Sequence, residues 1–105
     1  MIVDHLKPPY YAVIFTTIIS DNTKGYAETS KRIEALAKQQ EGYLGLEFAR
    51  NEIGITVSYW QSLEAIQNWK NNIEHTEART LGRDQWYKQY QLRICKVERE
   101  YGFKK

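Results

Sequence analysis

Residues 54–87 read GITVSYWQSLEAIQNWKNNIEHTEARTLGRDQWY, and this stretch decides the fold. Its apolar residues first alternate and then recur every three or four positions, which is the pattern of a half-buried strand followed by an amphipathic helix. Ser62 stands between the two, where a helix N-cap is expected. The stretch therefore predicts a β-turn-α unit. Because it also holds all three tryptophans, a histidine and two arginines, we expect a functional site here.

Upstream, residues 11–19 predict a strand with apolar side chains on both faces. A strand in a half-solvated sheet would alternate apolar and polar residues, so both faces of this one must be covered. The chain's own helices can cover one face. We expect a partner, a second copy of the chain, to cover the other.

A helix is predicted over about residues 24–40, ended by Gly42, with N-caps offered by Asp21, Asn22 and Thr23. A strand over residues 43–50 and a short turn lead into a strand over residues 53–60. We expect these strands to share one face of large apolar residues and one face of small residues, with Glu47 as the charge on the small-residue face. The large apolar positions are Leu44, Leu46, Phe48, Ile53, Ile55, Val57 and Tyr59.

Downstream, residues 76–90 predict helical turns broken at Gly82, and residues 91–101 predict the last strand. In that strand Leu92 and Ile94 point one way, whereas Cys95 and Val97 point the other. This change of phase indicates either a β-bulge or a strand buried differently along its length. The order is β-α-β-β-α-β, the ferredoxin-like pattern of an α+β fold with an antiparallel sheet.

Pro8 and Pro9 separate a polar leader over residues 1–9 from the first strand, and the length predicts a single domain over residues 10–105. A hydrophobic fraction of 42% with 27% charged residues is ordinary for a soluble globular protein. No apolar run approaches the roughly 18 residues of a membrane span, and the layout of a signal peptide is missing. With Cys95 as the single cysteine, we expect a cytoplasmic protein.

Charge and metal-ligand patterns exclude two function classes. The net charge is +2 and the basic residues are spread along the chain, so nucleic-acid binding is not expected. His5 and His75 are the two histidines, and neither a CxxC nor an HExxH pattern occurs. We therefore expect no protein-built metal site.

Several segments resemble the antibiotic biosynthesis monooxygenase family of dimeric α/β-barrel proteins. They are EGYLG at residues 41–45, SYWQSLEAI at residues 58–66, Trp69, His75 and Gly82-Arg83. The resemblance covers about residues 10–101. It implies a homodimer packed through its sheet faces, with a pocket between the sheet and the helices of each subunit. Members include cofactor-free oxygenases of anthrones and quinols, haem-degrading oxygenases and proteins with no established activity.

The resemblance also implies roles for single residues. In the anthrone-type oxygenases a Trp and an Arg line the pocket, and Trp69 matches the Trp, with Arg79 or Arg83 as the Arg. In the haem-degrading members an Asn on the first strand acts with a Trp and a His. Here residues 10–19 hold no Asn, and His75 lies roughly 120° around the helix from Trp69, so we expect no haem cofactor.

Each candidate has a structural alternative. Trp69 fits either a pocket wall or core packing, and Trp60 and Trp86 fit either ligand binding or core and dimer contacts. His75 and Arg79 share a helix face that could be a solvated polar cluster. Arg83 could stabilise an oxyanion or pair with a neighbouring acid, and Glu47 could be a base if desolvated.

The sequence therefore favours a cofactor-independent monooxygenase acting on an aromatic or quinol-type molecule in a tryptophan-lined pocket. Its candidate catalytic residues are Arg83, Trp69 and His75, and its candidate substrate-binding residues are Trp60, Trp69, Arg79, Trp86 and Glu47. Two alternatives stay open: a non-catalytic small-molecule-binding or stress-associated dimeric domain, and a haem-binding or haem-degrading protein.

Overall fold

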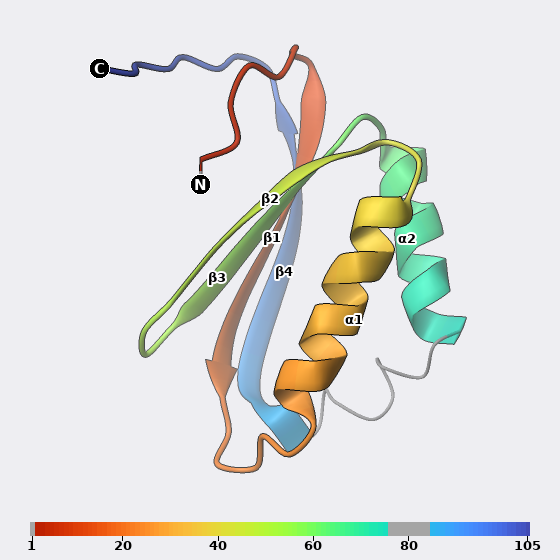
Figure 1. Ribbon diagram of the computed structural model, residues 1–105, viewed down its shortest axis with the longest axis vertical. Helices are drawn as coiled ribbons and strands as arrows, with labels where there is room; N and C mark the ends of the chain where they lie inside the picture. Colours follow the sequence, from red (N-terminus) through yellow and green to blue (C-terminus); the bar gives the residue numbers. More distant parts are fainter. Residues whose placement is uncertain (1, 76–84) are drawn as a thin grey trace.

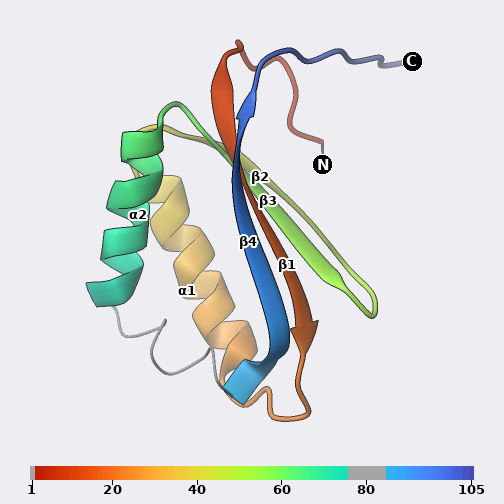
Figure 2. The same ribbon diagram turned by 180° about the vertical axis from the view of Figure 1, so that it is seen from behind.

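The computed structural model describes residues 2–75 and 85–105, apart from the side chains of residues 74 and 75. The four described strands form one antiparallel sheet in the order β2-β3-β1-β4, and both described helices lie on one side of it (Figures 1 and 2). This is the α+β, ferredoxin-like arrangement expected from the sequence. The elements are β1 (Tyr10–Ile19), α1 (Tyr26–Gln39), β2 (Tyr43–Arg50), β3 (Gly54–Trp60), α2 (Leu63–His75) and β4 (Tyr87–Val97).

The pairing register sorts the side chains of the sheet into a helix face, which the helices cover, and an open face on the other side. The helix face consists of four cross-strand rows. Beginning at the tryptophan end, they are Tyr43, Trp60, Tyr11 and Lys96; Leu46, Ser58, Val13 and Ile94; Phe48, Thr56, Phe15 and Leu92; and Arg50, Gly54, Thr17 and Tyr90.

The core lies between the first two rows and the helices. Its buried members are Val13 and Trp60 of the sheet, Ala37 of α1, and Ala65 and Ile66 of α2. Strand β1 is apolar on both faces, as expected, because Val13 enters this core while Ile14 and Ile18 belong to the open face. Neither described helix has the length and apolar character needed to cross a bilayer.

We expected the large apolar residues of β2 and β3 to share one face of the sheet, and this prediction is wrong. Leu46 and Phe48 lie opposite Ser58 and Thr56, whereas Glu47 lies opposite Val57 on the open face. The register shifts between Tyr43 and Gly45, so the alternation in one strand cannot be projected onto the next by counting from the start of each.

The start of α1 also differs from the prediction. The N-cap is Gly25, which has a left-handed φ of 81° and makes no side-chain capping bond, so the three proposed cap residues do not serve as caps. A backbone turn closes instead, because the Tyr26 N–H donates to the Thr23 carbonyl at 2.9 Å. Left-handed φ favours glycine, which explains why this helix begins without a polar cap.

Strand β4 begins at Tyr87, inside the segment expected to be helical, and ends at Val97. Its pairing with β1 is regular from Tyr90 onward, and the irregularity lies at Ile18/Ile19 instead. The change of phase within residues 92–97 therefore does not come from a β-bulge but from a strand that is buried differently along its length. Leu92 and Ile94 belong to the helix face, and Cys95 and Val97 belong to the open face.

Candidate ligand-binding site

Trp60 and Trp69 form a stacked pair between the sheet and α2. Their ring centroids are 5.0 Å apart and their planes differ by 30°. Trp60 is fully buried, and its indole N–H donates to Ser58 Oγ at 2.9 Å. The Trp69 Nε1 is also buried, but among the described residues it has no acceptor. One indole donor is thus satisfied, whereas its neighbour is buried without a partner among the described residues.

The first turn of α2 fixes where Trp69 lies. The Ala65 N–H donates to Ser62 Oγ at 3.0 Å, which confirms the predicted N-cap. The Gln61 N–H donates to the Gly42 carbonyl at 2.8 Å and ties the helix to the start of β2. A Cβ at position 42 would lie 2.7 Å from the Ala65 Cβ, so this close approach needs glycine. Trp69, two turns into the helix, is thereby held over Trp60.

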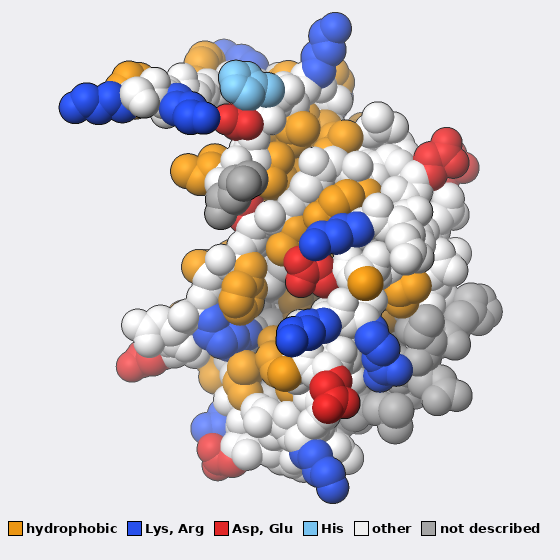
Figure 3. Space-filling model, viewed as in Figure 1, with side chains coloured by type: hydrophobic (Ala, Val, Ile, Leu, Met, Phe, Trp, Pro, Cys, Tyr) orange, Lys and Arg blue, Asp and Glu red, His pale blue; other side chains and the backbone are white. Residues whose placement is uncertain are grey.

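Beyond the tryptophans, the centre of the helix face is lined by the small side chains of β3, with larger apolar residues on either side. Ser58, Thr56 and Gly54 face the helices in turn along the strand. Phe48, on β2, is 59% exposed, and Leu92 and Ile94 on β4 are 44% and 50% exposed. Figure 3 shows apolar side chains gathered along the surface between β2 and α1. The helices therefore leave part of this face accessible to an apolar ligand.

Arg50 ends β2 on the same face, and sequence reasoning missed it. Its guanidinium lies over Gly54, where any Cβ would overlap it, and Nη2 donates to the Thr17 hydroxyl. The sequence feature that could have identified Arg50 is the short turn between β2 and β3, which places residue 50 opposite the glycine at residue 54. An arginine opposite a glycine on the neighbouring strand has room to lay its side chain flat on the sheet.

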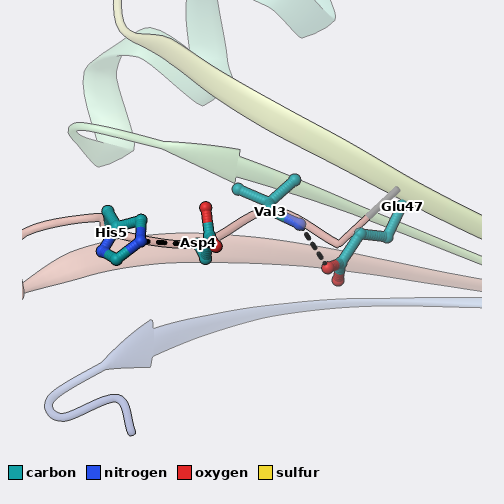
Figure 4. A network of polar contacts seen from close by, with 4 residues as sticks. All are labelled: Val3, Asp4, His5 and Glu47. Carbon is teal, nitrogen blue, oxygen red and sulfur yellow. Dashed lines mark hydrogen bonds and ion pairs between the residues drawn. The ribbon is translucent and has the colours of Figure 1, made fainter. Parts of the chain in front are cut away.

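Glu47, a predicted pocket residue, lies on the open face, away from the tryptophan pair. Its carboxylate accepts the Tyr59 hydroxyl at 2.5 Å. It also accepts the Val3 N–H of the leader at 2.9 Å (Figure 4). Nearby, the Tyr10 hydroxyl donates to Glu100 at 2.7 Å. These bonds attach both ends of the chain to the sheet, so the structure gives Glu47 a tethering role.

The two tyrosines of this open-face network are poor acids. Burial, followed by the hydrogen bond to Glu100, raises the pKa of Tyr10 to about 12. Burial and the bond to Glu47 raise the pKa of Tyr59 well above its usual range. Both hydroxyls therefore stay protonated as donors at neutral pH, because ionising them would place two negative charges side by side.

Trp86 lies at the opposite end of α1 from the core cluster. Its ring meets Tyr26 edge-on at 5.5 Å, and its N–H donates to the Lys24 carbonyl at 2.8 Å. Ala37 lies eleven positions after Tyr26, about 16 Å along the helix. Trp86 therefore anchors the start of α1, and the structure does not bring it to the tryptophan pair.

The remaining candidates, Arg79, Arg83 and the side chain of His75, lie outside the described residues. Their proposed roles stay predictions. Within the described ranges, no group of three or more histidine, cysteine, aspartate or glutamate residues could hold a metal ion.

The fold and the site define a class: a small ferredoxin-like α+β protein with an aromatic-lined site between sheet and helices. The chain matches the family model "Antibiotic biosynthesis monooxygenase" over residues 9–81. It is also 48% identical over 99 residues to the uncharacterized protein YqjZ of Bacillus subtilis, covering 92% of this chain and 87% of YqjZ. The chain belongs to the antibiotic biosynthesis monooxygenase family.

Two solved structures illustrate the range of proteins with this fold. A mutant of SnoaB, a cofactor-independent oxygenase from Streptomyces nogalater, is similar with a TM-score of 0.74 and 9% identity, over 89% of this chain and 97% of SnoaB. A mutant of MhuD with two manganese protoporphyrin IX molecules bound per active site has a TM-score of 0.65 and 21% identity, over 89% of this chain and 99% of MhuD. At these identities the likeness shows the fold alone.

Proposed function

We propose that this protein is a cofactor-independent monooxygenase that acts on an electron-rich aromatic molecule of the anthrone or quinol type, bound on the helix face beside Trp69. The buried, acceptor-free indole N–H of Trp69 carries the proposal. An unsatisfied buried donor costs about 1–3 kcal/mol, and a ligand oxygen would recover that cost. A quinol or anthrone offers such an oxygen together with a flat ring that can pack beside the tryptophan.

The chemistry asks little of the protein. For an anthrone, the ring methylene loses two hydrogens and gains one oxygen atom of O₂, and the second oxygen atom leaves with those hydrogens as water. The substrate anion supplies the electrons, so the protein must favour that anion, hold it in an apolar site and exclude water. The Trp69 N–H can stabilise the anionic oxygen, as preorganised donors do where charge develops.

Turnover in the presence of dissolved oxygen tests this function. Oxygen uptake with an anthrone should exceed the rate of uncatalysed autoxidation, with the quinone as product. Trp69→Phe keeps an aromatic ring and removes the indole N–H, so it should weaken binding of a ligand that carries a ring oxygen. It should weaken the affinity for naphthalene, which has no acceptor, much less. Loss of affinity for both ligands would point to disturbed packing instead.

Arg83 is proposed, from the sequence, as a further cation that stabilises the oxyanion. Arg83→Ala should then slow turnover by roughly 10²-fold or more. A turnover rate equal to that of the parent would remove Arg83 from the mechanism and leave the Trp69 part intact.

A non-catalytic binding domain is the second candidate. It would bind the same aromatic ligands through the same face, with no oxygen uptake above autoxidation. The third candidate is a haem protein, for which His75 is the histidine to test. Hemin titration should give no sharp Soret shift that depends on His75. Abolition of stoichiometric hemin binding by His75→Ala would contradict this.

We also propose that the active form is a homodimer packed through the open face. The open face carries Ile14 of β1 beside Val57 of β3. Ile55, on the same face, is 44% exposed. A second copy of the sheet would cover these apolar side chains.

A further inference from the structure

We infer that Arg50, held in place by Thr17 and Gly54, is an anchor for the carboxylate group of an aromatic acid. The inference rests on the proposed aromatic site of the helix face and names a substrate class for it: ligands that carry one negative charge beside the ring. Arg50 lies outside the residues that the sequence singled out.

The guanidinium of Arg50 is held in place but not neutralised. Its Nη2 donates to the hydroxyl of Thr17, a residue only 2% exposed. Its Nε is buried and has no hydrogen-bond partner, and the described residues provide no ion pair for it. A guanidinium has five N–H donors, and burying such donors without acceptors is costly. The structure therefore leaves a positioned cation with donors unused.

Gly54 allows this placement. The guanidinium lies where a Cβ at position 54 would be, so every other residue type would displace it. Gly54 does not have a left-handed φ, so its backbone conformation does not require glycine. The reason for glycine at this position is the contact with the Arg50 guanidinium. This dependence gives a second residue through which the site can be tested.

The neighbouring row of the helix face can receive a ring. Phe48 and Phe15 lie on either side of Thr56, one row from Arg50 and on the same face. Successive rows along a strand are about 7 Å apart. In 2-naphthoate the carboxylate oxygens lie about 5 Å from the centre of the ring system, and a hydrogen bond of about 2.9 Å extends this reach to the next row. A ring that lies over Thr56, between the two phenylalanines, would thus place its carboxylate at the guanidinium.

A carboxylate matches the site better than a phosphate does. The row that contains Arg50 holds Gly54, Thr17 and Tyr90 and no second cation. One guanidinium balances one charge, and its planar fork matches the planar carboxylate. We therefore assign a monoanionic aromatic acid.

The test compares 2-naphthoate with 2-naphthamide, a neutral molecule of nearly the same shape, by isothermal titration calorimetry. The parent protein should bind 2-naphthoate about tenfold or more tightly than 2-naphthamide, because charge-assisted hydrogen bonds are roughly twice as strong as neutral ones. Arg50→Gln should abolish this preference, because it should weaken the binding of 2-naphthoate far more than that of 2-naphthamide. Arg50→Lys, which keeps the charge but loses the fork, should retain only part of the preference.

Gly54→Ala provides a matched variant at a different residue. It should reduce the preference in the parent background, because the new Cβ displaces the guanidinium, and it should have no further effect in the Arg50→Gln background. The parent protein gives a readout that needs no variant. The ¹H–¹⁵N resonance of Arg50 Nε–H should shift much further on addition of 2-naphthoate than on addition of 2-naphthamide.

The outcomes separate the two proposals. If both ligands bind the parent protein equally well, and Arg50→Gln changes neither affinity, the carboxylate anchor is overturned while the aromatic site stands. If neither ligand binds, the aromatic site itself fails, and the anchor for an aromatic acid fails with it.

Discussion

Hydrogen-bond satisfaction distinguishes the three tryptophans. Trp60 donates to Ser58 and Trp86 donates to the Lys24 carbonyl, whereas the buried N–H of Trp69 has no acceptor in the described part of the chain. The amino-acid sequence does not show which of the three indole N–H groups has an acceptor, and the helical spacing of Trp69 fits core packing as well as a pocket wall. Only the positions of acceptors in space show which indole is available to bind.

Tyr10 supplies a test of the open-face network through pH. Its pKa is raised from 10.0 to about 12, so between these values the native state keeps a proton that the unfolded chain releases. Stability should therefore fall as the pH rises from 10 to about 12. In Tyr10→Phe this fall, followed as the denaturant midpoint, should be smaller.

Tyr101→Phe is the matched control, because Tyr101 is 87% exposed in the tail and its loss should leave the pH dependence of the parent intact. A Tyr10→Phe variant with the same alkaline slope as the parent would show that burial of Tyr10 and its bond to Glu100 do not raise its pKa in solution.

At the level of elements, the sequence predicts which helices and strands form, and in what order, better than it predicts the face of the sheet on which each side chain lies. The alternation in residues 53–60 and the helical spacing after Ser62 predict β3 and α2 correctly. Glu47 was placed on the wrong face because the register shift near Gly45 depends on pairing with β3, which no pattern within β2 reveals. Likewise, the start of α1 depends on a left-handed Gly25, while nearby polar residues offered a false cap.

The Ser62 cap gives a prediction for α2. Ser62→Ala removes the acceptor of the Ala65 N–H and should cost about 1 kcal/mol of unfolding free energy. Because α2 carries Trp69, affinity for ring ligands should weaken as well. Ser30→Ala, in the exposed middle of α1, is the matched control and should be neutral or slightly stabilising, because alanine is the better helix former. Equal effects of the two changes would refute the cap.

For the whole molecule, the helices cover one face of the sheet, and the leader and the tail extend on the other side (Figures 1 and 2). The leader reaches Glu47 through Val3, which covers only part of the open face. Ile14 and Ile18 of β1 share that face with Ile55 and Val57 of β3. These apolar side chains are the part of the sheet that the proposed second chain would cover.

Sedimentation of an Ile55→Glu variant tests the dimer. The parent should sediment as a dimer at micromolar concentration with an interface of at least about 1,200 Å² in total, and a buried glutamate in that interface should dissociate it. Ile53→Glu is the control, because Ile53 is 51% exposed in the turn between β2 and β3 and precedes the paired strand. A monomeric parent would contradict the proposal.

The most direct measurement follows the three indole N–H resonances by ¹H–¹⁵N correlation spectroscopy while 1,4-dihydroxynaphthalene is added without oxygen. Trp69→Phe identifies the Trp69 resonance by its loss. The Trp69 signal should move downfield and saturate with the ligand, as an N–H does when it gains an acceptor, while the already bonded Trp60 and Trp86 signals should move much less. A Trp69 signal that stays in place while the ligand binds, or equal shifts of all three, would contradict the account.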